Sequence, residues 1–154
     1  MTTRRTRLVR FAVGIFVTVL AIAACDKGHP RAESLGLAQA PADLSKLEGN
    51  AWVADSILDP HVSLVPGSQI DMRFKSDSLS ANAGCNTLFG GASIHGDTLV
   101  VPALASTKKA CDDTLNQQDT WLTDFLSSRP TIELLETDLW LSHGNDTVIH
   151  LVQQ

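Results

Sequence analysis

Residues 69–91 read QIDMRFKSDSLSANAGCNTLFGG, and this stretch carries the pattern that decides the fold. Ile70, Met72 and Phe74 alternate with polar residues, which predicts a strand with one buried face. The segments that follow are equally short, and HGD at residues 95–97 has the composition of a turn between two of them. This spacing predicts a meander of short antiparallel strands.

The same alternation occurs on both sides of the meander. Residues 47–57, LEGNAWVADSI, place a glycine before an alternating run around Trp52, which predicts a first strand. Near the end of the chain, residues 131–136, 138–143 and 147–152 predict three more strands joined by turns. The sheet therefore draws its strands from both ends of the domain.

One segment has a different period. Leu115, Leu122, Phe125 and Leu126 lie near one face at 3.6-residue spacing, which predicts a helix over residues 113–128. Asp112 or Asp113 can cap its first turn, and a proline follows its end. Because strands outnumber helices and every connection is short, we predict an α+β domain. Its mainly antiparallel sheet curls into a small barrel with one packed helix.

The composition narrows the classes of function. The chain has 154 residues, 44% of them hydrophobic and 19% charged, which is typical of one globular domain. There is no tyrosine, and few aromatic rings are present to stack on bases. Without residues 1–24, eight basic residues face seventeen acidic ones, a formal charge of −9. Phosphate backbones repel such a domain, so we expect no nucleic-acid partner.

Residues 1–24 have the layout of a secretory signal peptide: a basic start, an apolar run and small residues before a possible cut. The apolar run, residues 11–24, would rise about 21 Å as a helix, short of the roughly 30 Å hydrocarbon core. This length argues against the alternative, an uncleaved transmembrane anchor.

The end of the apolar run is more specific. Ile22, Ala23, Ala24 and Cys25 resemble the bacterial lipobox, which implies cleavage before Cys25 and attachment of diacylglyceryl to its sulfur. Two acyl chains give stable anchoring. We therefore expect an exported protein that is attached to the membrane through this diacylglyceryl anchor. It would lie on the outer face of the cytoplasmic membrane, which is the periplasmic side of the inner membrane if the organism has an outer membrane.

Residues 25–44 contain prolines, glycines and alanines without a sustained apolar period, and we interpret them as the lipidated cysteine and a flexible tether. The folded domain is then expected over residues 45–154. Nearly all of it, from Leu47 to Val152, resembles the META domain, also called the HslJ family. The most specific shared residues are Gly84, Cys85, Asn86, Phe89, Gly91, Thr107 and Cys111. Two departures are Lys109, where members often carry methionine, and the doubled glycine after Phe89.

This resemblance implies a small β-barrel-like fold with a helix, often carried by bacterial envelope lipoproteins linked to stress tolerance. It implies no catalytic residues. A similarity in fold to pilot lipoproteins of secretion systems suggests an apolar ligand or a protein partner, although fold does not determine function. We therefore expect a non-enzymatic envelope protein with a binding or stress-tolerance role. The first alternative is a binder of an apolar ligand or a secretion-system partner in the barrel mouth. A second, less favoured alternative is a cysteine-dependent enzyme.

The cysteines leave three interpretations open. With Cys25 lipidated, Cys85 and Cys111 remain in an exported domain, which favours a disulfide between them. Alternatively, Cys85 is a nucleophile with a histidine such as His95 as its base, although no local signature supports this. The third interpretation is a zinc site built from Cys85, Cys111 and histidines. These residues lack the close paired spacing of structural zinc motifs, so we expect no metal and no cofactor.

Other candidate residues have structural interpretations. Asn86 suits a left-handed backbone after a bulge. Trp52, Trp121 and Trp140 are each expected in the core, and the alternative is an apolar pocket lined by some of them. The aspartates at positions 112, 113, 119 and 124 fall on the predicted helix, so they indicate a capped, solvated helix face rather than a calcium loop.

Overall fold

The computed structural model of the protein describes residues 42–154. The predicted signal peptide, Cys25 and most of the predicted tether lie outside this range. None of the helices within residues 42–154 is long and apolar enough to cross a membrane.

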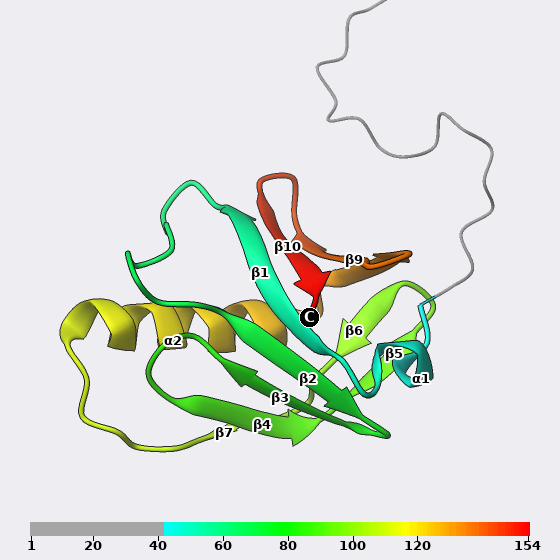
Figure 1. The fold of residues 1–154 in the computed structure, drawn as a ribbon, viewed down its shortest axis with the longest axis horizontal. Coiled ribbons are helices and arrows are strands. Elements are labelled where there is room, and N and C mark those ends of the chain that lie inside the picture. The colour runs from blue at the N-terminus through cyan, green and yellow to red at the C-terminus, as the bar shows by residue number, and fades with distance from the viewer. Residues whose placement is uncertain (1–41) are drawn as a thin grey trace, which may run out of the picture. The chain divides into compact units, whose positions relative to one another are not determined.

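Ten strands form one antiparallel sheet (Figure 1). The strands are β1 (Ala51–Leu58), β2 (Asp71–Lys75), β3 (Ser78–Asn82), β4 (Thr87–Gly91), β5 (Ser93–His95), β6 (Thr98–Val100), β7 (Ala105–Ser106), β8 (Thr131–Leu135), β9 (Asp138–His143) and β10 (Thr147–Gln153). Their order across the sheet is β5-β6-β8-β9-β10-β1-β2-β3-β4-β7. Pairing of β1 with β10 joins the first and last strands at the centre, so the meander and the C-terminal strands form one surface.

The sheet curls into a half-barrel, and helix α2 (Asp113–Ser127) lies along it (Figure 1). Inward-facing side chains of the strands pack against this helix and are almost fully buried. Examples are Met72, Leu79, Leu88, Leu139, Leu141, Ile149 and Leu151, which are 0–1% exposed. The predicted fold class, an α+β domain with a curled antiparallel sheet and a packed helix, is confirmed.

Helix α2 begins and ends where local chemistry predicts. The carboxylate of Asp112 accepts a hydrogen bond from the Leu115 N–H and caps the first turn. Bonds from the Thr114 hydroxyl and the Leu115 N–H hold the pKa of Asp112 below its ordinary value. After the helix, Arg129 takes a left-handed backbone with φ of 62°, and Pro130 prevents further helix. The apolar face of the helix buries Leu122 and Leu126 completely.

A second, short helix was not predicted from the sequence. Helix α1 (Leu44–Leu47) is capped by the Asp43 side chain, and Leu47 is 0% exposed in the core. Ala42 and Leu44 also pack against the core, although the sequence placed them in the tether. A single helical turn is too short to show a hydrophobic periodicity, so the sequence of this segment cannot be distinguished from that of a linker.

Candidate functional site

The GCN motif forms the tight connection between β3 and β4. Gly84 has φ of +103°, which side chains rarely adopt. A Cβ at Gly84 would also lie 2.9 Å from Ser68 Cβ and 3.0 Å from Leu115 Cδ2. Only glycine fits this conformation and this space, so Gly84 allows the connection to pass close beneath helix α2.

A disulfide joins Cys85 to Cys111, with their Cα atoms 6.2 Å apart. It ties the β3–β4 connection to the segment that enters helix α2. Both sulfurs are used in this bond, so Cys85 carries no thiol that His95 could activate, and the interpretations as a nucleophile and as a zinc ligand are wrong for this state. Within residues 42–154, no group of three or more His, Cys, Asp or Glu side chains is arranged to hold a metal ion.

Asn86 is the centre of a buried polar cluster, and the residue is only 8% exposed. Its Nδ2 donates to Asp119 Oδ2 at 2.8 Å, and its backbone N–H donates to the same oxygen at 2.8 Å. Its Oδ1 accepts bonds from Thr107 Oγ1 at 3.0 Å and from the Lys109 N–H at 2.8 Å. Asn86 does not have positive φ, so the expected left-handed conformation is wrong. The residue acts through its side chain.

The partners of Asn86 explain two features of the motif. Thr107 Oγ1 donates to Asn86 and also accepts from the Thr87 N–H at 3.0 Å, which fixes the chain after β7 against β4. Lys109 contributes only its backbone N–H to Asn86, so this contact does not depend on which side chain stands at position 109. A lysine at this position is therefore compatible with the hydrogen bonds of Asn86.

Asp119 contradicts the expectation of a solvated helix face. It is 6% exposed, and its Oδ2 accepts both bonds from Asn86, while its Oδ1 is buried without a partner among residues 42–154. Its neighbour Gln118, 2% exposed, was not singled out from the sequence. Gln118 Oε1 accepts from the Val65 N–H at 2.7 Å, and its Nε2 donates to Ser68 Oγ and to the Ala83 carbonyl. These two side chains fix helix α2 to two separate loops, the β1–β2 loop and the β3–β4 connection.

The remaining motif residues lie on β4. Phe89 points to the outer face and is 48% exposed, so it is no part of the core. The doubled glycine has a steric reason, because a Cβ at Gly90 would lie 2.2 Å from the Ala103 carbonyl oxygen. Gly90 thus allows the chain after β6 to cross against β4, whereas a Cβ at Gly91 would meet only the Asp77 carbonyl, at 3.8 Å.

The domain that carries these residues matches a known family. The family model of the META domain matches residues 45–154. The chain belongs to the META domain family.

Solved structures share the fold of this META domain. One is an NMR structure of a protein that is 18% identical, with a TM-score of 0.58, covering 72% of this chain and 95% of its own. Another is the NMR structure of a protein from Burkholderia xenovorans, 19% identical, with a TM-score of 0.59, covering 82% of this chain and 97% of its own. Comparison with curated proteins finds no match. At these identities the likeness concerns the fold.

The three tryptophans of the META domain do not share a pocket. Trp52 is 1% exposed in the core, and its Nε1 donates to the Leu47 carbonyl. Trp121 is half-buried on helix α2, stacked on Phe125 with ring centroids 5.7 Å apart. Trp140 lies on the outer face of the sheet and is 39% exposed. The core interpretation therefore holds for Trp52, holds in part for Trp121, which packs against the core, and is wrong for Trp140, which is exposed.

Asp59 connects the loop after β1 to the rest of the domain. Its carboxylate accepts bonds from the backbone N–H groups of His61 and Val62, from Trp121 Nε1 at 3.1 Å and from Thr147 Oγ1 at 3.0 Å. Partial burial raises the pKa of this carboxyl, but the four donors together outweigh it and leave the pKa below its ordinary value.

This geometry predicts a pH-dependent effect for Asp59→Asn. The amide keeps one acceptor oxygen, which can serve either the His61 and Val62 N–H groups or Trp121 and Thr147 but not both pairs. We therefore expect a loss of about 1 kcal/mol in the free energy of unfolding at neutral pH. Stabilisation by a carboxylate of lowered pKa is complete above the unfolded pKa of about 3.9 and is lost as the pH falls through the folded pKa. Urea denaturation of both proteins from pH 7 to 2 should therefore show the difference shrinking below about pH 4. A constant difference would contradict this account.

Proposed function

We propose that this protein is an exported lipoprotein of the bacterial envelope whose META domain acts by binding, without catalysis, in envelope maintenance under stress. The observation that carries the proposal is in the sequence. A basic start, an apolar run and the lipobox ending at Cys25 occur in the required order within the first 25 residues. Cleavage and diacylation there would leave the domain on a tether at the outer face of the cytoplasmic membrane.

The Cys85–Cys111 disulfide supports export. Disulfides persist in oxidising compartments such as the periplasm and are rare where thiols are kept reduced. The disulfide joins two segments that are also joined by the hydrogen bonds of Asn86, so its role in the fold is structural.

A binding role fits the chemistry of the buried groups better than catalysis. Asn86 and Gln118 direct their polar atoms to loops of the domain itself, and the motif cysteines are bonded to each other. The inner side of the sheet is filled by side chains, which gives no support to an apolar ligand inside the barrel. The hollow of about 460 Å³ beside Trp121 is lined mainly by polar residues of helix α2. A protein partner at the outer surface is therefore the better candidate.

Lipidation can be tested by metabolic labelling with a radioactive fatty acid in a bacterial host that processes lipoproteins. We expect the wild-type chain to incorporate label and Cys25→Ser to incorporate none. The matched control is the double variant Cys85→Ala, Cys111→Ala, which keeps its lipobox and should be labelled like the wild type. Equal labelling of wild type and Cys25→Ser, or no label in either, would refute the anchor.

A further inference from the structure

The outer face of strands β8, β9, β10 and β1 carries an apolar patch centred on Trp140. Three of the four large hydrophobic residues that are most exposed in residues 42–154 belong to it: Leu58 (51%), Leu135 (47%) and Trp140 (39%). We call it the Trp140 patch, and it comprises Val53, Leu58, Leu135, Trp140, Val148 and Val152.

The strand register places these residues on one face of the sheet. Leu58 pairs with Val148, and Val53 pairs with Val152, so each pair shares the outer face of β1 and β10. Asp138 pairs with Val152 on one side and with Leu135 on the other, so Leu135 lies in the same cross-strand row as Val152. Trp140 lies between these rows, opposite His150. All four adjacent strands thus contribute apolar side chains to this face, with Glu133, Asp138 and His150 between them.

Trp140 is held in place by its neighbours. Its ring stacks on His150, with centroids 3.9 Å apart and planes at 16°. His150 Nε2 lies 2.7 Å from Asp138 Oδ1, and its Nδ1 lies 3.5 Å from Asp55 Oδ2. An exposed ring fixed from one side loses little rotational freedom when a partner covers it, which favours its use as a contact residue.

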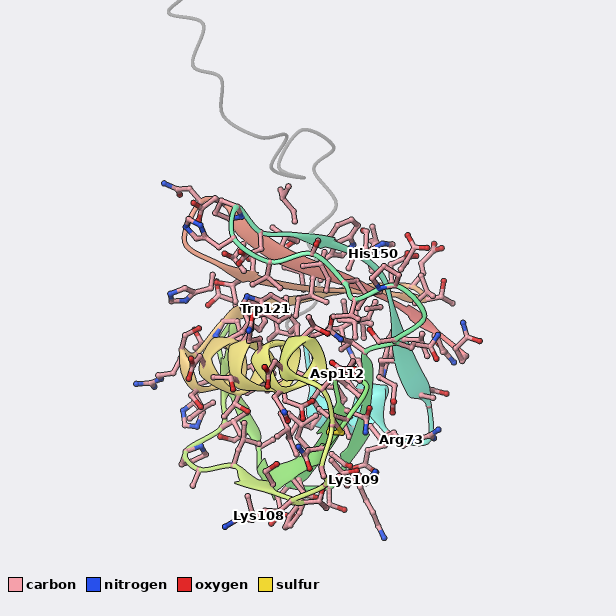
Figure 2. The ribbon with its side chains drawn as sticks, turned by 90° about the vertical axis from the view of Figure 1, so that its left-hand side faces the viewer. Arg73, Lys108, Lys109, Asp112, Trp121 and His150 are labelled. Atoms are coloured by element: carbon pink, nitrogen blue, oxygen red, sulfur yellow. A yellow bond between two sulfur atoms is a disulfide. The ribbon has the colours of Figure 1, made fainter. Side chains whose placement is uncertain are left out.

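The charges around the patch have one sign. Asp55, Glu133 and Asp138 lie on its strands, and Glu136 lies in the turn between β8 and β9, whereas these four strands contain no lysine and no arginine. Three cations lie away from the patch: in Figure 2, Arg73, Lys108 and Lys109 lie at the lower side of the domain and His150 at the upper side. The patch is therefore acidic as well as apolar: Asp138 pairs with both Val152 and Leu135, and Glu133 pairs with Trp140.

We propose that the Trp140 patch docks a cationic amphipathic segment of another protein, whose apolar side chains cover Trp140 and whose lysines or arginines pair with these four carboxylates. Charge complementarity selects this occupant. The four carboxylates would repel an anionic bilayer, and a second copy would bring the same carboxylates against themselves in a two-fold interface. The inference rests on the proposed binding role but not on the lipid anchor, which the labelling experiment tests separately.

The test uses ¹⁵N-labelled residues 26–154 and two synthetic peptides of identical amphipathic pattern, one built from leucine and lysine and the other from leucine and glutamate. We expect the lysine peptide to shift amide signals of β1, β8, β9 and β10 and the glutamate peptide to shift none. Trp140→Ser should weaken binding of the lysine peptide at least tenfold, and Glu133→Gln with Asp138→Asn should weaken it several-fold and reduce its salt dependence.

The matched control is Phe89→Ser, which removes an equally exposed aromatic residue from the outer face of the same sheet, in the hollow beside Arg73 and Lys75. It should leave binding unchanged. Preserved amide dispersion in each variant shows that the fold is intact. Equal binding of both peptides, shifts centred on β2 to β4, or shifts on the Trp140 patch by anionic phospholipid vesicles instead of the lysine peptide would each overturn the proposal.

Discussion

Replacing Asn86 with alanine should lower the free energy of unfolding by about 3 kcal/mol. The substitution removes the Nδ2 donor to Asp119 and the Oδ1 acceptor for Thr107 and the Lys109 N–H, in a site that is almost closed to solvent. Each buried polar group left without its partner costs about 1–3 kcal/mol, and charged groups cost more. Chemical denaturation monitored by circular dichroism measures the change.

Three further variants define the cause of this loss. Asn145→Ala, in the exposed turn before β10, changes the same residue type and should cost less than about 0.5 kcal/mol. Asn86→Asp keeps the shape but places a second carboxylate against Asp119, so its destabilisation should be larger at pH 7 than at pH 4. Asp119→Ala combined with Asn86→Ala should cost less than the sum of the two single changes. A loss below about 1 kcal/mol for Asn86→Ala would show that the cluster is not important for stability.

Removing the disulfide should have the other large effect. Cys85 and Cys111 are 26 residues apart, and the chain-entropy model assigns a loop of this size roughly 3–4 kcal/mol. We expect Cys85→Ala with Cys111→Ala to lower the free energy of unfolding by about this amount, a large share of the 5–15 kcal/mol typical of a domain. The relevant measurement is urea denaturation with and without a reductant.

The reductant provides the internal control for this second prediction. It should destabilise the wild type to the level of the double alanine variant and leave that variant unchanged. If the wild type unfolds at the same urea concentration with and without reductant, under conditions in which free thiols are shown to form, the stabilising role of the bond is wrong.

The sheet and the main helix could be predicted from local patterns because each depends on which residues face inward. Ile70, Met72 and Phe74 are all at most 2% exposed, as their alternation predicts. Leu122 and Leu126 likewise lie on the buried face of α2. The same rule could have placed Trp140 outside, since Leu139 and Leu141 on either side of it face inward.

The polar interior of the site could not be predicted in this way. Asp119 is buried because the β3–β4 connection passes over it and offers the two donors of Asn86, 33 residues earlier in the chain. Gln118 is buried for a similar reason, through contacts 35 to 53 residues away. Residue type alone indicates a solvated helix face for both, and only tertiary contacts reverse this expectation.

One measurement tests the account of an exported, lipid-anchored and disulfide-bonded META domain most directly: mass spectrometry of a non-reduced digest of the protein isolated from bacterial membranes. The account predicts an N-terminal peptide that starts at Cys25 and carries diacylglyceryl, together with a peptide pair linked through Cys85 and Cys111. An N-terminal peptide that retains residues 1–24, or free thiols at both Cys85 and Cys111, would contradict it.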